Sequence, residues 1–280
     1  MCEMLGISAK RRREANATLR EFFSHAERHP HGWGLARFPA RVGRDAPIAP
    51  SVGSRVPRDR ATHIAPLIEK EPHKATVSEH LRHLLDERID DPTILAHIRF
   101  ATVGTMEYEN CHPFTGTDNS GRVWTLAHNG TVFDGAVLNE YIGVQYGETD
   151  SERVLLHLID LVDRAQIRLG RPLSESERFD VLASAIAALA NGNKLNLLIF
   201  DGDVLYAHTN FRGALYFLKD EDSITLSTNP LSHGDWKPLP FTRLVAIKAG
   251  EFVREGPSHD HEYIHNPEDY RLVYMNFARL

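Results

Sequence analysis

The stretch HIRFATVGTMEYENCHPFTGTDNSGRVWTLAHNG, residues 97–130, organises the rest of the chain. An apolar strand expected at residues 93–100 delivers Arg99 near its end, and a second expected strand, 122–127, runs into the sequence His-Asn-Gly at 128–130. An arginine fork matches a carboxylate, and an asparagine amide beside a glycine N–H can stabilise an oxyanion. The stretch therefore predicts two strands that end at one polar site.

Length and composition are those of an ordinary globular chain. The 280 residues are 42% hydrophobic and 25% charged, which is enough for one large domain with a substantial core. A formal net charge of −6 gives no global attraction to nucleic acid or to anionic membranes. No apolar run approaches the roughly 20 residues of a membrane helix. We expect a single domain over residues 2–280, with neither nucleic acid nor a membrane as a partner.

The two cysteines, Cys2 and Cys111, cannot form a disulfide framework, and the N-terminal sequence lacks a signal-peptide pattern. We therefore expect a cytoplasmic protein with reduced thiols, in which Cys111 is a packing residue. If Met1 is removed, Cys2 becomes a nucleophile whose own α-amine can accept the thiol proton near neutral pH. Taken alone, Cys2 is better interpreted as merely a small residue near the start of the chain, so its companions must decide.

The periodicity of apolar residues divides the chain into early strands, central helices and a late run of strands. This order predicts an α+β fold with layered sheets. Residues 39–61, rich in Pro, Gly and Arg, are expected to form a surface loop, and 256–280 a C-terminal extension. The expected helices are 17–28, 76–88, one that follows 147–152, and one opened by a Ser174 and Glu177 capping box. The other expected strands are 4–8, 33–38, 195–200, 204–208, 214–218, 223–227, 244–248 and 251–254.

Several familiar chemistries have no motif in this chain. It lacks the phosphate loop, the dinucleotide-binding glycine pattern, the serine nucleophile elbow and a C-x-x-C pair. Two His-rich patches have no further acidic ligand at a telling spacing, so we expect neither a metal site nor a cofactor. The patches are His25, His29 and His31, and His259, Asp260, His261 and His265.

An ordered set of motifs, taken together with Cys2, resembles the class II glutamine amidotransferase domain of the N-terminal-nucleophile hydrolases. It is most similar to the stand-alone bacterial type related to the γ-glutamyl amidase of ergothioneine synthesis. The resemblance implies a four-layer αββα sandwich, in which two stacked, mostly antiparallel sheets are flanked by helices. The motifs are MCEMLG (1–6), GWG (32–34), AHIRFAT (96–102), N-x-HPF (110–114), AHNG (127–130) and ETDSE (148–152), with weaker matches at STNPL (227–231) and Trp236.

The resemblance also implies a role for each site residue. Cys2 would attack the δ-carboxamide of glutamine, and the Asn129 side chain and the Gly130 N–H would form the oxyanion hole. Arg99 would hold the substrate α-carboxylate in a two-pronged ion pair, and Asp150 would hold the α-ammonium group. The residues expected to shape the pocket are Thr102, His128 and His112, with His97.

Each of these residues has an ordinary interpretation as well. Arg99 would serve as a strand-end ion pair, the Asn129-Gly130 pair as a simple turn, and Asp150 as a helix N-cap. The chain also departs from the family pattern at two positions. His31 stands where an acidic residue usually precedes Gly-Trp-Gly, and Val103 stands where the sugar aminases have a histidine, which leaves the details of the substrate open.

Three functions remain open from the sequence. The first is a glutaminase-type amidotransferase acting on glutamine, with ammonia passed in trans to a separate synthase or simply released. The second is a γ-glutamyl amidase that releases a larger amine. The third is a catalytically silent module that binds glutamine for regulation.

Overall fold

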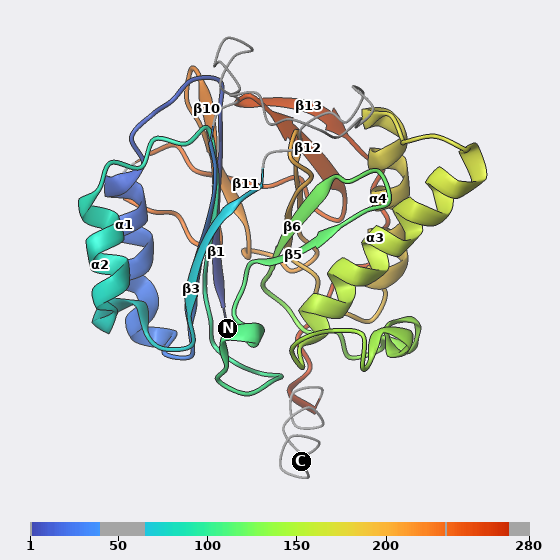
Figure 1. The fold of residues 1–280 in the computed structure, drawn as a ribbon, viewed down its shortest axis with the longest axis horizontal. Helices are drawn as coiled ribbons and strands as arrows, with labels where there is room; N and C mark the ends of the chain where they lie inside the picture. The colour runs from blue at the N-terminus through green and yellow to red at the C-terminus, as the bar shows by residue number, and fades with distance from the viewer. Residues whose placement is uncertain (1, 40–64, 233, 269–280) are drawn as a thin grey trace, which may run out of the picture.

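Two antiparallel sheets stack face to face in the computed structural model, which describes residues 2–39, 65–232 and 234–268 (Figure 1). The seven-stranded sheet has the order β11-β9-β10-β1-β4-β2-β3, and the six-stranded sheet the order β13-β12-β8-β7-β6-β5. The strands of the first are β1 (Glu3–Ala9), β2 (Trp33–Phe38), β3 (Leu67–Glu71), β4 (Thr93–Ile98), β9 (Tyr216–Lys219), β10 (Ser223–Ser227) and β11 (Lys237–Pro238). Those of the second are β5 (Phe114–Thr117), β6 (Val123–His128), β7 (Leu197–Phe200), β8 (Leu205–His208), β12 (Leu244–Lys248) and β13 (Glu251–Glu255).

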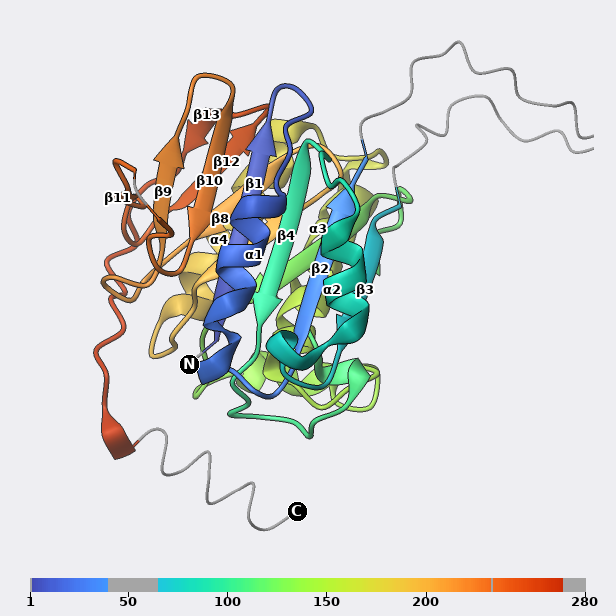
Figure 2. The ribbon, with the colours of Figure 1, turned by 90° about the vertical axis from the view of Figure 1, so that its left-hand side faces the viewer.

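Helices cover the outer face of each sheet. On the seven-stranded sheet lie α1 (Asn16–Ser24), continued by the 3-10 turn η1 (His25–Arg28), and α2 (Glu79–Asp86). On the other sheet lie α3 (Asp150–Leu169) and α4 (Glu175–Ala190). Figure 2 shows α1 and α2 over β1, β4 and β2, which leaves the β9 and β10 end of that sheet without a helix. The layer order is therefore α, β, β, α, and the four-layer sandwich expected from the sequence is confirmed.

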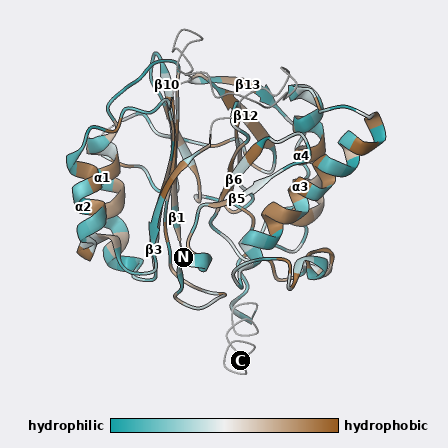
Figure 3. Cartoon of the chain, in the orientation of Figure 1, coloured by the Kyte–Doolittle hydropathy of each residue, from teal (hydrophilic) through white to brown (hydrophobic). Residues whose placement is uncertain are grey.

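Three apolar layers hold the sandwich together. One lies under α1 and α2, one between the two sheets, and one under α3 and α4. The hydropathy colouring of Figure 3 shows the same pattern, with the apolar faces of the helices turned towards the sheets. Leucines from β4, β7 and β8, represented by Leu95, Leu198 and Leu205, fill the space between the sheets and exclude water from it.

Most helices and strands occur where the sequence predicts them, within a few residues. The capping box of α4 is formed, because the Ser174 hydroxyl accepts from the Glu177 N–H while the Glu177 carboxylate accepts from the Ser174 N–H. Three short strands, β3, β5 and β11, were not predicted from the sequence. The edge strand β3 is rich in charge, and β5 carries Gly116, where an added Cβ would lie 2.6 Å from Ile159 Cδ1.

The described segment that follows β13 folds back onto the body of the protein. The N–H groups of His259 and Tyr263 donate to the carbonyls of Thr242 and Asn210, at 2.9 and 2.8 Å. The expected loop at 39–61 and the last residues of the expected extension, 269–280, fall outside the described residues, apart from residue 39. Within the described ranges no helix combines the length and the apolar character needed to cross a membrane.

Candidate active site

Cys2 lies where β1 begins, next to the end of β4. Antiparallel pairing sets Glu3 opposite Ile98, so the thiol comes to rest beside Phe100. The Phe100 N–H donates to Sγ at 3.3 Å, and the thiol donates to the Phe100 carbonyl at 3.4 Å. Burial raises the pKa of the Cys2 thiol, and this shift is opposed by the hydrogen bond to Phe100 and by the positive charges of Arg99 and Lys194.

The half-buried Cys2 side chain opens onto a cavity of about 300 Å³. Asn129, Phe100 and Thr228 line it near the thiol, with Phe211 and Asn229 among the other lining residues. A second hollow of about 480 Å³ shares Glu3, Arg28 and Asn229 with this cavity. The cavity at the Cys2 thiol therefore adjoins a second hollow, with Glu3, Arg28 and Asn229 between them.

Asn129 and Gly130 follow β6 and lie across the inter-sheet space from β1. The backbone of Asn129 is fixed on both sides by Asn196, whose carbonyl accepts at 2.9 Å and whose side-chain amide donates at 2.6 Å. The Asn129 amide nitrogen lies 3.5 Å from the Thr228 hydroxyl, a long contact that leaves it available as a donor. Thr228 in turn accepts from the Met4 N–H at 2.9 Å and so ties this amide to β1.

Gly130 is at a position where no side chain fits. An added Cβ would lie 1.9 Å from the Lys194 carbonyl oxygen and 2.4 Å from His128 Nε2. Within the described part of the chain, the Gly130 N–H donates to no acceptor. The turn after β6 thus offers two donors without strong partners, the Asn129 side-chain amide and the Gly130 N–H, which is what an oxyanion hole requires.

Arg99 is buried, and its guanidinium is occupied by the loop that follows β4. Nη1 donates to the Thr105 carbonyl at 2.8 Å, and Nη2 donates to the carbonyls of Val103 and Gly104 at 2.8 and 3.0 Å. No carboxylate of the described residues lies within ion-pair distance of this guanidinium. The interpretation of Arg99 as a strand-end ion pair is therefore wrong, and its cationic head instead organises residues 103–105.

The same loop is anchored from outside by Glu148. Its carboxylate accepts from the N–H and the hydroxyl of Thr105, at 2.9 and 2.8 Å. These two bonds lower the pKa of Glu148. Asn110, predicted as a family position, accepts from the Glu148 N–H at 2.8 Å and donates to the Thr105 carbonyl at 3.1 Å. The loop after Arg99 is therefore held at its far end by a small polar network.

The two residues that depart from the family pattern both take part in this loop, His31 through its ring and Val103 through its backbone. His31 Nδ1 accepts from the Ala101 N–H at 2.9 Å, so the ring carries its proton on Nε2. Val103 contributes its carbonyl to Arg99, a contact that does not depend on the side chain. Both positions thus keep a structural part in the loop although the residue types differ.

Asp150 is the first residue of α3 and lies behind the Gly130 turn. Its carboxylate accepts from the Val132 N–H at 2.8 Å and from the Ser151 hydroxyl at 3.2 Å. The helix cap is Thr149, whose side chain accepts from the Glu152 N–H, so the N-cap interpretation of Asp150 is wrong. Asp150 interacts electrostatically with Arg99, and neither residue lines the cavity at Cys2.

The predicted pocket-shaping residues lie behind the cavity and do not line it. The Thr102 hydroxyl is 3.5 Å from that of Thr131. His128 is fixed between the Ser151 hydroxyl at 3.0 Å and the Lys194 carbonyl at 3.2 Å. His112 stacks on His97 with ring centroids 4.1 Å apart, and neither of its ring nitrogens has a hydrogen-bond partner in the described structure. Burial lowers the pKa of all three histidines.

Phe211 and Thr228 line the cavity with Cys2, Lys194 lies against Phe211, and none of the three was predicted from the sequence as a site residue. Lys194 is fully buried, and its ammonium lies 4.2 Å from the centroid of the Phe211 ring. A lysine is seldom buried, and this one stands in an unremarkable turn before β7, so no local pattern marked it. The weak family match at 227–231 was the one signal that pointed towards Thr228.

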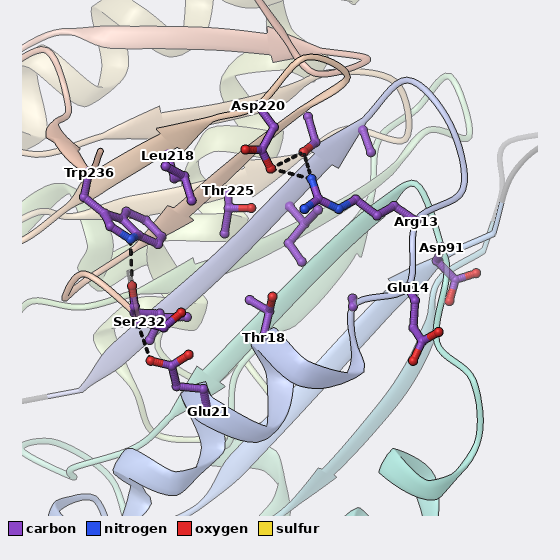
Figure 4. A pocket seen from close by; sticks show the side chains of 15 residues that line it. Arg13, Glu14, Thr18, Glu21, Asp91, Leu218, Asp220, Thr225, Ser232 and Trp236 are labelled. Atoms are coloured by element: carbon purple, nitrogen blue, oxygen red, sulfur yellow. Dashed lines mark hydrogen bonds and ion pairs between the residues drawn. The ribbon is translucent and has the colours of Figure 1, made fainter. Parts of the chain in front are cut away.

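Cys111, the other thiol, is fully buried, and burial raises its pKa to about 11. It is therefore a packing residue, as expected. The described residues contain no group of three or more side chains that could hold a metal ion. A separate hollow between α1 and the uncovered β9 and β10 end contains Trp236, Leu218 and Arg13 and none of the predicted site residues (Figure 4).

Comparisons with known proteins agree with this geometry. A family model described as "Glutamine amidotransferases class-II" matches residues 1–221. An uncharacterized protein of Methanocaldococcus jannaschii is 29% identical over 285 residues, which cover 90% of this chain and 71% of that protein. A provisionally named glutamine amidotransferase of Haemophilus influenzae is 23% identical, over 91% of this chain and 87% of its own.

Among solved structures, the glutamine phosphoribosylpyrophosphate amidotransferase of B. subtilis superimposes with a TM-score of 0.62 at 14% identity. The match covers 91% of this chain and 49% of that one, so this chain spans about half the length of that enzyme. A likeness at this identity establishes the N-terminal-nucleophile hydrolase fold alone. The family match over residues 1–221 establishes more: the chain belongs to the class II glutamine amidotransferases, enzymes that act on an amide C–N bond.

Proposed function

We propose that this protein hydrolyses glutamine, with Cys2 as the nucleophile once Met1 has been removed. The observation that carries the proposal is the single cavity onto which both the Cys2 thiol and the Asn129 side chain open. The Gly130 N–H next to Asn129 has no acceptor in the described structure, so it remains available to a developing negative charge. Cys2 and Asn129 line the cavity and Gly130 follows directly in the chain, and a nucleophile with two oxyanion donors is the minimum that acyl transfer needs.

The reaction follows from these groups. The thiol loses its proton to the α-amine of Cys2, and the thiolate adds to the δ-carbonyl carbon of glutamine. Asn129 and Gly130 stabilise the oxyanion, and each donor typically contributes about 3 to 4 kcal/mol. As the C–N bond breaks, the α-ammonium group returns its proton to the leaving nitrogen, which departs as ammonia. Water then cleaves the γ-glutamyl thioester to give glutamate and the free thiol.

The amino-acid end of the substrate needs one cation and one anion. We assign that pair of charges to Arg99 and Asp150, which interact electrostatically with each other behind the residues that line the cavity. Thr102, His128 and His112 act indirectly, by fixing the turn after Gly130 and the wall between the sheets. The ammonia produced is either released or taken up by a synthase supplied in trans.

A second candidate is favoured by the size of the space beyond the thiol. The cavity at Cys2 measures about 300 Å³ and adjoins another of about 480 Å³, both larger than an ammonia leaving group requires. Arg28 and Asn229 line both spaces, so an amine with polar substituents would find partners there. This arrangement supports a γ-glutamyl amidase that releases a larger amine.

The test uses the full-length protein after intact mass has shown that Met1 is absent. Glutamate and amine release would be measured for glutamine and for a panel of γ-glutamyl amides. We expect turnover with at least one of these substrates, its loss in Cys2→Ala, and its retention in Cys111→Ala, the matched control for a thiol remote from the cavity.

The outcomes separate the candidates. Efficient ammonia release from glutamine selects the glutaminase, and a preference for larger amides selects the amidase. Glutamine binding without any turnover would leave only the silent regulatory module. Full turnover in Cys2→Ala would refute the proposed nucleophile whatever the substrate.

A further inference from the structure

The ammonium group of Lys194, a residue that precedes β7, lies against Phe211, which lines the cavity at Cys2. Its backbone precedes β7 and pairs with Thr131, so the Lys194 carbonyl accepts from the Thr131 N–H at 3.0 Å and limits position 130 to glycine. Its side chain runs inward and is fully buried, with Nζ 4.2 Å from the Phe211 ring centroid. Phe211 lines the same cavity as Cys2. Lys194 therefore supports the turn at Asn129 and Gly130 with its backbone and places a positive charge against the wall of the cavity at Cys2.

We propose that Lys194 is a positioning residue for the reaction, whose buried ammonium, held over Phe211, favours the thiolate form of Cys2. This inference rests on the proposed function only in taking Cys2 as the nucleophile. Lys194 keeps its own protons throughout. The S–H bond of Cys2 breaks, an N–H bond forms on the α-amine, and the lysine charge stabilises the sulfur anion that results.

Lys194 shares with Arg99 the task of bringing positive charge to Cys2. The charged and titratable groups that line the cavity or act on the thiol are Glu3 on β1, Arg28 and His29 after α1, Arg99 beyond β4, Lys194 before β7 and the α-amine. The Glu3 carboxylate bonds to His25 at 2.8 Å and lies 3.7 Å from His29, and Glu3 is not among the groups that act on the Cys2 thiol. Arg99 also acts on the thiol, and more strongly than Lys194 does, while its donors are held by loop carbonyls.

The state of Lys194 is consistent with this role near neutral pH. Burial lowers its pKa to about 8, and interaction with Cys2 acts in the opposite direction. The lysine is thus still largely protonated at pH 7. The reciprocal effect is present at the thiol, where the Lys194 charge opposes the increase in pKa that burial causes.

The test measures the pH dependence of Cys2 alkylation by iodoacetamide, followed by peptide mass so that Cys2 and Cys111 are counted separately. Removing the charge in Lys194→Met should raise the apparent pKa of Cys2 by about one unit, the low end of the effect of a nearby opposite charge. Lys194→Arg should keep the wild-type value within about half a unit. Lys70→Met is the matched control, because Lys70 is also largely buried but donates to the Cys111 carbonyl at 2.9 Å.

The acid limb of kcat/KM for the preferred substrate should shift in the same direction in Lys194→Met. An unchanged alkylation pKa in a folded Lys194→Met protein would overturn the inference. If that variant does not fold, Phe211→Leu carries the test: loss of the ring frees the ammonium, and an unchanged Cys2 pKa there would overturn the inference equally. Absence of turnover with a shifted alkylation pKa would refute the proposed function and leave the role of Lys194 standing.

Discussion

Buried histidines should make the stability of this protein fall steeply in mild acid. Burial lowers the pKa of both His97 and His208 from 6.5 to about 3, and it lowers the pKa of His112 well below its usual value. Between pH 3 and 6.5 the unfolded chain therefore binds protons that the folded protein does not. The free energy of unfolding is at its full value above pH 6.5 and decreases as the pH falls towards 3.

The magnitude follows from the size of the shift. At pH 5, one and a half units below 6.5, each of His97 and His208 lowers the free energy of unfolding by about 2 kcal/mol, at about 1.4 kcal/mol per pK unit. Together they account for about 4 kcal/mol, a large share of the roughly 5 to 15 kcal/mol typical of a domain. His112 adds to this total in the same direction.

The assay is urea unfolding at a series of pH values between 4.5 and 7.5. In His97→Gln, the unfolded and folded states should differ by about one bound proton fewer than in the wild type. The slope of the free energy of unfolding against pH should therefore decrease by about 1.4 kcal/mol per pH unit below pH 6. His83→Gln, a change at an exposed position on α2, is the control. A His97→Gln slope equal to that of the wild type would refute the reasoning, whatever the absolute stability of the variant.

Three further outcomes follow from single contacts. Asn129→Ala should lower kcat by about 100- to 1,000-fold with the fold intact, measured by steady-state kinetics, and an unchanged kcat would remove it from the oxyanion hole. Glu148→Gln keeps the geometry of the bonds to Thr105 but not the charge, so kcat/KM should fall about fivefold, from a loss of about 1 kcal/mol. Asp201→Asn leaves the buried Arg178, now 2.7 Å from that carboxylate, unpaired, so urea unfolding should show a loss of about 3 to 5 kcal/mol, and a loss below 1 kcal/mol would contradict this.

Helices and strands could be predicted from the sequence where the local residue pattern matches the environment that the fold provides. The strand that carries Arg99 is apolar on both faces because helices cover one and the second sheet covers the other, so a continuous apolar run predicts it. The capping box at Ser174 is local by nature and survives in the fold. The edge strand β3 has no such pattern, because it pairs on one side only and carries charged residues, which a sequence reading takes for a loop.

The site could be predicted in part for the same reason. Asn129 and Gly130 were visible as a motif, but the reason for the glycine, the Lys194 carbonyl 1.9 Å from any added Cβ, comes from a segment 64 positions later in the chain. Lys194 and Phe211 contribute through long-range packing, and neither belongs to a recognisable spacing. Such residues can be located only once the two sheets are placed face to face.

The occupied guanidinium of Arg99 sets a condition on substrate binding. The group has five N–H donors, and both of those on Nη2 are used, by the carbonyls of Val103 and Gly104. A two-pronged carboxylate grip needs Nη2, whether its partner is Nη1 or Nε. The grip proposed for the substrate α-carboxylate therefore requires at least one of these carbonyls to withdraw. Gly104, with φ of +81°, is the residue of this turn best able to change conformation. Part of the affinity for the amino-acid end is thus spent on rearranging residues 103–105, so substitutions in this loop should alter KM without touching the nucleophile.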